Sequence, residues 1–117
     1  MTVLILINDV PYGTEKAYNA FRLAMVLQKD HPNVQVNVFL MADAVGCALP
    51  NQTTPQGYYN IERMLKSVIL KGGKVKACGT CADARGIRNV PLIEGAEIGN
   101  MAELAKWTVE SDKVFTF

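Results

Sequence analysis

The chain opens on an uninterrupted run of apolar residues. The run extends from Thr2 to Ile7, with every position from Val3 onward apolar, and the polar pair Asn8-Asp9 ends it. Strands that are buried on both faces are typical of parallel sheets covered by helices, whereas half-exposed strands alternate apolar and polar positions. The run therefore predicts a first strand that is buried on both sides.

Apolar residues then recur at helical spacing. Between Glu15 and Lys29 they form one stripe, with charged and amide side chains on the other face, and Thr14 stands where an N-cap is expected. After the turn at His31-Pro32-Asn33, the segment from Val34 to Met41 is again typical of a strand. A strand, a helix and a second strand in this order indicate a βαβ unit with parallel strands.

The same alternation continues to the end of the chain, after a long irregular stretch from Asp43 to Gly57. Two segments resemble capping boxes, Thr80 with Asp83 and Asn100 with Glu103. The predicted elements are a helix over 59–71, a strand over 74–78, a short helix ending at Arg85-Gly86, a short strand or apolar bridge over 90–93, a helix from Asn100 to about Glu110 and a last strand over 113–117. We expect one α/β domain over residues 1–117, with three layers (α/β/α) and an open, mainly parallel sheet of about five strands.

Composition narrows the classes of function. Half of the 117 residues are apolar, a fifth are charged, and the formal net charge is +1. These values fit one globular domain, and no block of like charge offers a surface for nucleic acid or anionic lipid. The apolar start follows no basic residue and is far shorter than the ~20 residues of a membrane span. We therefore expect a cytoplasmic protein, whose thiols stay mostly reduced.

Ligands of open parallel sheets bind outside the carboxyl ends of the strands. In the predicted fold, the segments 8–14, 42–57 and 78–86 meet at that edge and bring Cys47 and Cys78 to it. The candidate substrate-binding residues in these segments are Asn8, Tyr12, Gly13, Asp43, Gly79, Thr80 and Arg85. A plain turn at Tyr12-Gly13 and a helix cap at Asp43 are the structural alternatives.

The strongest local signal is Cys78-Gly79-Thr80-Cys81, a C-x-x-C motif between a strand and a helix. The free amide groups and the dipole of a helix N-terminus stabilise a thiolate, and Arg85 and Arg88 add positive charge nearby. The motif therefore suits nucleophilic sulfur chemistry, with Cys78 and Cys81 as the catalytic candidates.

Other interpretations of the cysteines stay open at this point. They could be small buried apolar residues without chemistry. A structural zinc site needs four ligands, and the motif supplies only two. Cys47 is a candidate for the third ligand, but His31 lies at the opposite end of the predicted sheet, so the case for zinc is weaker. A thioredoxin-like redox site fits the spacing, but here the motif follows the third strand and the only tryptophan, Trp107, lies in another helix. We expect no metal and no other cofactor.

Taken together, the segments resemble the DsrE/TusD-like family of small sulfur-relay proteins, and most closely its YchN-like branch. The resemblance covers nearly the whole chain. The segments that carry it are Ala17–Leu27, Phe39–Val45, Gly57–Leu65, Cys78–Ile87, Pro91–Gly99, Leu104–Thr108 and Asp112–Phe117.

The resemblance implies an α/β/α fold and assembly of identical chains into trimers or hexamers. It also implies that a cysteine after the third strand carries sulfur as a persulfide between donor and acceptor proteins. That cysteine precedes an Arg-Gly pair, which matches Cys78 before Arg85-Gly86. Cys81 fits the YchN-like branch as a resolving thiol, and Cys47 lies outside the pattern. The alternative function is a non-catalytic oligomeric protein of the same fold that binds a small ligand at the strand ends.

Overall fold

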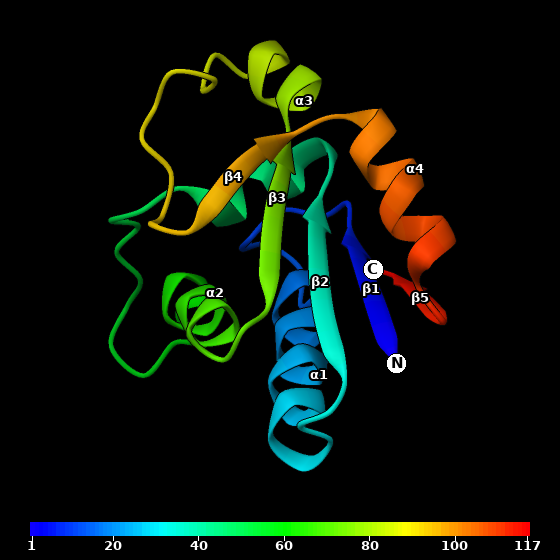
Figure 1. Cartoon of the computed structure of the whole chain (residues 1–117). Coiled ribbons are helices and arrows are strands. Elements are labelled where there is room, and N and C mark those ends of the chain that lie inside the picture. Colours follow the sequence, from blue (N-terminus) through cyan, green and yellow to red (C-terminus); the bar gives the residue numbers. More distant parts are fainter.

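The computed structural model describes residues 1–117, with five strands side by side at its centre (Figure 1). Strands and helices alternate along the chain, as the hydrophobic pattern predicts. The elements are β1 (Thr2–Ile7), α1 (Lys16–Asp30), β2 (Gln35–Leu40), the 3-10 helix η1 (Ala42–Ala48), α2 (Ile61–Leu70), β3 (Lys74–Cys78), α3 (Gly79–Ala84), β4 (Ala96–Gly99), α4 (Met101–Glu110) and β5 (Lys113–Thr116).

The strands lie in the order β4-β3-β2-β1-β5, and every neighbouring pair is parallel. The chain moves outward from β1 to β4, then returns through α4 and places β5 on the other side of β1. The predicted fold class, an open parallel sheet in a three-layer α/β domain, is confirmed.

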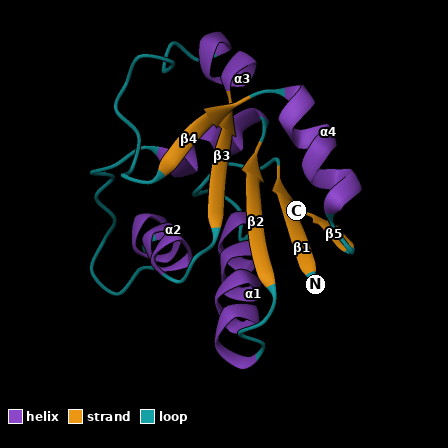
Figure 2. Ribbon diagram, viewed as in Figure 1, coloured by secondary structure: helices purple, strands orange, loops and turns teal.

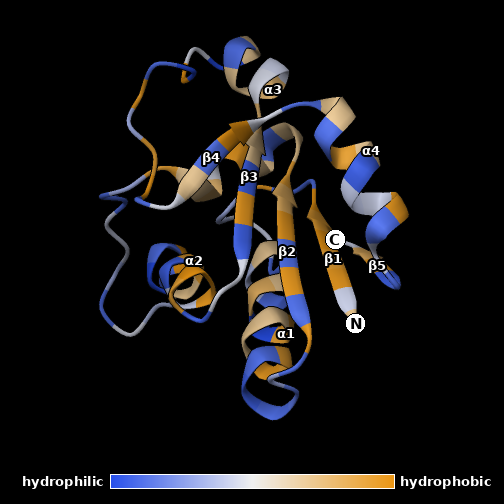
Figure 3. Ribbon diagram, in the orientation of Figure 1, coloured by the Kyte–Doolittle hydropathy of each residue, from blue (hydrophilic) through white to orange (hydrophobic).

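The two faces of the sheet are covered by different helices. α1 and α2 lie on one face, and α4 lies on the other (Figure 2). Leu4 and Ile5 of β1 point to opposite faces and are both completely buried, which explains the continuous apolar run at the start of the chain. β1 is correspondingly hydrophobic over most of its length, whereas β2 and β3 also carry hydrophilic bands (Figure 3). None of the helices is long and apolar enough to cross a membrane.

Several local predictions are wrong. Of the two alternatives for residues 90–93, the strand does not form. Ile93 is a buried apolar residue whose N–H donates to the Ala48 carbonyl at 2.9 Å, and the edge strand β4 follows at Ala96–Gly99. The stretch from Asp43 to Gly57 is not irregular throughout, because η1 occupies its first part.

Two predicted helix caps are also wrong. The pattern predicts Thr80 as the N-cap of α3, but the helix begins at Gly79 and its N-cap is Cys78. Thr14 is the predicted N-cap of α1, but the N-cap of that helix is Glu15, which makes no side-chain cap hydrogen bond. The equivalent prediction for α4 is confirmed, since Asn100 and Glu103 form a reciprocal capping box.

Candidate functional site

Cys78 is the last residue of β3, at the carboxyl edge of the sheet, where the strand turns directly into α3. Its Sγ accepts a hydrogen bond from the backbone N–H of Cys81 at 3.4 Å. The residue is 5% exposed, so its sulfur is shielded from bulk solvent. The strand and the helix therefore hold this thiol in a fixed direction.

Cys81 lies one helical turn further along and contacts Cys78. The Ala42 N–H donates to Cys81 Sγ at 3.2 Å. Burial, and then a hydrogen bond with the Cys78 thiol, raise the pKa of Cys81 above its ordinary value. Cys81 consequently keeps its proton at neutral pH and can donate it to the Cys78 sulfur. Both cysteines are free thiols.

Arg85 fastens α3 to η1. Its Nε and Nη2 lie 2.9 and 2.8 Å from Asp43 Oδ1, and its Nη1 donates to the Cys81 carbonyl at 3.1 Å. Partly exposed ion pairs contribute at most about 1 kcal/mol to stability, so the main effect of this pair is on position. It holds the segment that starts at Ala42 against Cys81. Two candidates from the sequence, Asp43 and Arg85, thus meet beside the thiols.

Arg88 lies over Gly79, inside the motif. Its Nε and Nη2 donate to Asp83 Oδ1 and Oδ2 at 2.8 and 2.9 Å. Hydrogen bonding to Asp83 and the charge of that carboxylate raise the pKa of Arg88, with a smaller contribution from Cys78. Asp83, the predicted second half of a capping box, is therefore the anchor of this guanidinium group.

Cys47 lies in η1 but takes no part in the thiol pair. It is completely buried, and burial raises the pKa of its thiol to about 12. It makes no side-chain hydrogen bond to Cys78 or Cys81. His31 lies just past α1, and no three His, Cys, Asp or Glu side chains lie close enough to hold a metal ion together.

Tyr12 belongs to a second cluster, made of all four tyrosines of the chain. Its ring lies 5.9 Å from that of Tyr58 and 5.5 Å from that of Tyr59, which stacks on Tyr18 at 4.1 Å. The Tyr12 hydroxyl accepts the N–H of Ile61, the first residue of α2. Hydrogen bonding with Tyr58 raises the pKa of Tyr59 to about 12. This cluster joins the loop after β1 to the start of α2, and no hydrogen bond links it to the thiols.

The other candidates have separate surroundings. The backbone N–H of Asn8 donates to the Phe117 carbonyl at 2.8 Å and so holds the end of the chain. Gly13 has a φ of +115° in the turn before α1, a conformation that favours glycine. Thr80 is exposed, and its side chain makes no hydrogen bond. The structure therefore gathers Asp43, Gly79 and Arg85 around the two thiols, and places Asn8, Tyr12 and Gly13 elsewhere.

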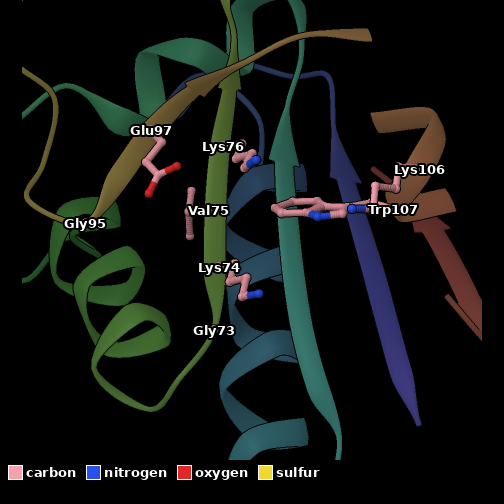
Figure 4. A pocket seen from close by; sticks show the side chains of 8 residues that line it. All are labelled: Gly73, Lys74, Val75, Lys76, Gly95, Glu97, Lys106 and Trp107. Carbon is pink, nitrogen blue, oxygen red and sulfur yellow. The ribbon is translucent and has the colours of Figure 1, made fainter. Parts of the chain in front are cut away.

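A hollow of about 380 Å³ lies on the α4 side of the sheet (Figure 4). Charged side chains line it, among them Lys74 and Lys76 of β3 and Glu97 of β4. It opens there because α4 packs Trp107 edge-on against Phe39 of β2, with ring centroids 6.0 Å apart, beside the uncovered front of β3 and β4. Neither thiol of the motif lines this hollow.

Ala42 also contributes to the site, although nothing in the sequence pattern points to it. Its N–H holds Cys81 in place, and its φ of +50° is rare for a residue other than glycine. An alanine carries no chemical signal, and the contact joins positions that are distant in sequence. Only the fold reveals it.

The comparisons with known proteins agree with this fold. The sequence matches the DsrE/DsrF-like family over residues 1–117. The chain belongs to this family. The DsrE-like chain is 45% identical to protein YchN of Escherichia coli strain K12 over 115 residues, which are 98% of this chain and 97% of YchN. An uncharacterized protein of Methanocaldococcus jannaschii is 38% identical over the full length of both chains.

Solved structures extend the comparison. The crystal structure of YchN from E. coli matches this DsrE-like chain with a TM-score of 0.95, over 99% of this chain and 98% of that one. A protein of unknown function from Methanobacterium thermoautotrophicum matches with a TM-score of 0.78 at 14% identity, over 99% and 97% of the two chains. The second match shows the fold alone. The family and the fold that the sequence resembles are both confirmed.

Proposed function

We propose that this DsrE-like chain is a sulfur-relay protein in which Cys78 carries sulfur as a persulfide. The observation that carries the proposal is the contact between two free thiols, Cys78 and Cys81, at the carboxyl end of β3. Parallel sheets place their reactive groups at this edge. Membership of the DsrE/DsrF-like family supports the same function. The chemistry needs free thiols, so we place it in a reducing compartment such as the cytoplasm.

Loading is a transfer of one sulfur atom. The Cys78 thiolate attacks the terminal sulfur of a donor persulfide, R–S–SH. A bond forms between Cys78 Sγ and that sulfur, the donor S–S bond breaks, and the donor leaves as the thiolate R–S⁻. The proton on the transferred sulfur moves with it and is then lost to water. No external oxidant or reductant is needed, because the exchange conserves the number of S–S bonds. Transfer to an acceptor thiolate repeats the same exchange in the other direction.

Cys81 offers a second way to unload the sulfur. As a thiolate it attacks Cys78 Sγ of the persulfide, a Cys78–Cys81 disulfide forms, the S–S bond of the persulfide breaks, and the outer sulfur, which has taken up a proton from water or from the Cys81 thiol, leaves as HS⁻. The persulfide is the oxidant in this step, and a small thiol or thioredoxin-type reductant returns the disulfide to two thiols. The raised pKa of Cys81 keeps it mainly protonated at neutral pH. We therefore expect this release to be slow at neutral pH.

The test is to incubate the reduced protein with a cysteine desulfurase and cysteine, and then to measure the intact mass. One added sulfur that maps to Cys78 is the expected result. Cys78→Ser should abolish loading, whereas Cys81→Ser should load normally and release sulfide more slowly. Cys47→Ala is the matched control, and we expect it to load as the wild type does because Cys47 is buried apart from the pair.

Retained loading in Cys78→Ser would contradict the assignment. No loading of the wild type, with its thiols shown to be reduced and accessible, would favour the alternative of a non-catalytic, ligand-binding protein with the same fold.

A further inference from the structure

The guanidinium group of Arg88 lies directly over Gly79, the residue that follows Cys78. A Cβ at position 79 would stand 2.8 Å from Arg88 Nη2, 2.9 Å from Cζ and 3.0 Å from Nη1. Contacts this short force one of the groups to move. The absence of a side chain at Gly79 is therefore what lets the guanidinium group settle next to the Cys78 backbone.

Asp83 holds this guanidinium in place with two hydrogen bonds, to Nε and Nη2. Nη1 makes no hydrogen bond within the chain, and it is one of the atoms that lie over Gly79. Hydrogen bonding to Asp83 and then the charge of that carboxylate raise the pKa of Arg88, with a smaller contribution from Cys78. Because Asp83 occupies Nε and Nη2, the free Nη1 is left over Gly79, the neighbour of Cys78.

Arg85, the other arginine of the site, differs in this respect. Its Nε and Nη2 are occupied by Asp43, and its Nη1 by the Cys81 carbonyl. All three nitrogens are engaged in holding η1 against α3. Arg88 alone combines a fixed position beside Cys78 with a free N–H donor.

We propose that Arg88 is the counter-ion of the sulfur anion on Cys78, so that the site prefers negatively charged sulfur species to neutral ones. The proposal rests on the proposed function and specifies its substrate class: anionic sulfur donors before loading, and the Cys78 persulfide after it. Hydropersulfides are stronger acids than thiols, so the terminal sulfur of a persulfide is an anion at neutral pH. A guanidinium N–H that is already oriented is a suitable donor for that anion.

The test compares two alkylating reagents that differ in charge. Iodoacetate is an anion and iodoacetamide is neutral, and both react with the same thiolate. The ratio of their rates at Cys78, followed by peptide mass, cancels any change in the reactivity of the sulfur itself. We expect Arg88→Gln to lower this ratio about two- to fivefold at low ionic strength, as a single charge a few ångströms away near the surface would do. Salt should lower the wild-type ratio toward that of the variant.

Three further variants separate the effect of the position of the Arg88 charge from the effect of the net charge of the protein. Arg22→Gln removes the same charge from α1, where Arg22 lies over the Tyr18 ring, and should leave the ratio unchanged. The double variant Asp83→Asn with Arg88→Gln keeps the net charge of the wild type, and its ratio should still be low. Gly79→Ala retains Arg88 but displaces its guanidinium group. Its rate ratio should therefore lie between that of the wild type and that of Arg88→Gln.

The same variants are then loaded with sulfur from the desulfurase. A lower rate ratio together with a lower persulfide occupancy in Arg88→Gln supports the proposal. An unchanged ratio in Arg88→Gln overturns it, even if Cys78 carries sulfur normally. A lower ratio in a protein whose wild type never loads sulfur overturns the persulfide as the ligand, and locates the failure in the proposed function rather than in the anion site.

Discussion

At the scale of single residues, the three cysteines differ in what surrounds each sulfur. Cys78 and Cys81 contact each other and receive backbone N–H donors, whereas Cys47 is enclosed by η1 and the core. Burial raises the pKa of the Cys47 thiol from 9.0 to about 12. This shift makes the free energy of unfolding depend on pH in the alkaline range, whatever the function of the protein.

A group whose pKa is raised by folding keeps its proton in the folded state and loses it first in the unfolded state. The Cys47 contribution is therefore fully present below pH 9.0 and disappears as the pH rises toward about 12. We expect the free energy of unfolding to fall in this window, by up to about 1.4 kcal/mol per pH unit from this thiol. Urea unfolding at a series of alkaline pH values measures the slope.

Cys47→Ala provides the comparison. We expect it to be destabilised at neutral pH by about 1 to 2 kcal/mol through lost packing, and to show a shallower alkaline slope than the wild type. Tyr59, whose pKa is also about 12, is present in both proteins, so the difference between the two slopes isolates the thiol. Equal slopes would mean that Cys47 ionises in the folded protein as it does in the unfolded chain.

At the scale of secondary structure elements, two helices with similar sequence signals begin in different ways. Asn100 caps α4 through its side chain, which accepts the Glu103 N–H at 2.9 Å. Thr80 occupies the same place in an apparent capping box, but Cys78 caps α3 instead. We expect Asn100→Ala to lower the free energy of unfolding by about 1 kcal/mol, and Thr80→Ala to change it by less than about 0.5 kcal/mol.

Denaturant unfolding of both variants measures this difference, with each serving as the control of the other. A loss in Thr80→Ala as large as that in Asn100→Ala would restore Thr80 as the cap of α3. Together, the two results test whether α3 begins at the end of β3, with Cys78 as its N-cap, or at the capping signal that Thr80 forms in the helix sequence.

The elements that the sequence predicts well are those whose signals are local. β1 and β3 match their predicted bounds because each has a regular pattern over nearly its whole length. β1 is a continuous apolar run, and β3 alternates polar and apolar residues. β4 escapes prediction because it has only four residues, one of them the exposed Glu97 and another Gly99. Its pairing with β3 creates a strand where the local pattern carries little signal.

At the scale of the whole molecule, the candidate site is a product of the topology. The order of the strands brings η1 and α3 together, so that Ala42 meets Cys81 across 39 positions and Asp43 meets Arg85 across 42. The sequence identified Cys78, Cys81, Asp43 and Arg85 as candidates because their side chains carry chemistry at the ends of predicted strands. It could not show that Tyr12 pairs with Ile61 instead, because that contact depends on how the loop after β1 folds onto α2.

The topology also leaves one edge strand of the sheet unpaired on its outer side. β5 is the outermost strand beside β1, and its outer backbone edge has no partner in the chain. Val114 and Phe115 of this strand are 44% and 42% exposed. An apolar edge strand of this kind is a surface for pairing or packing with another chain. We therefore propose that the protein forms a homo-oligomer, a trimer or a hexamer, with this edge in a contact between copies.

Sedimentation equilibrium at micromolar concentration tests this proposal. We expect the wild type to sediment as a trimer or hexamer, and Phe115→Lys to shift it toward the monomer, because a charge replaces apolar surface at the edge of the sheet. Leu70→Lys is the matched control, since Leu70 is an exposed apolar residue on α2, and it should leave the assembly unchanged. Circular dichroism on the same samples establishes that each variant is folded. A wild type that stays monomeric would contradict the assembly itself, whereas an intact oligomer of Phe115→Lys would move the contact away from β5.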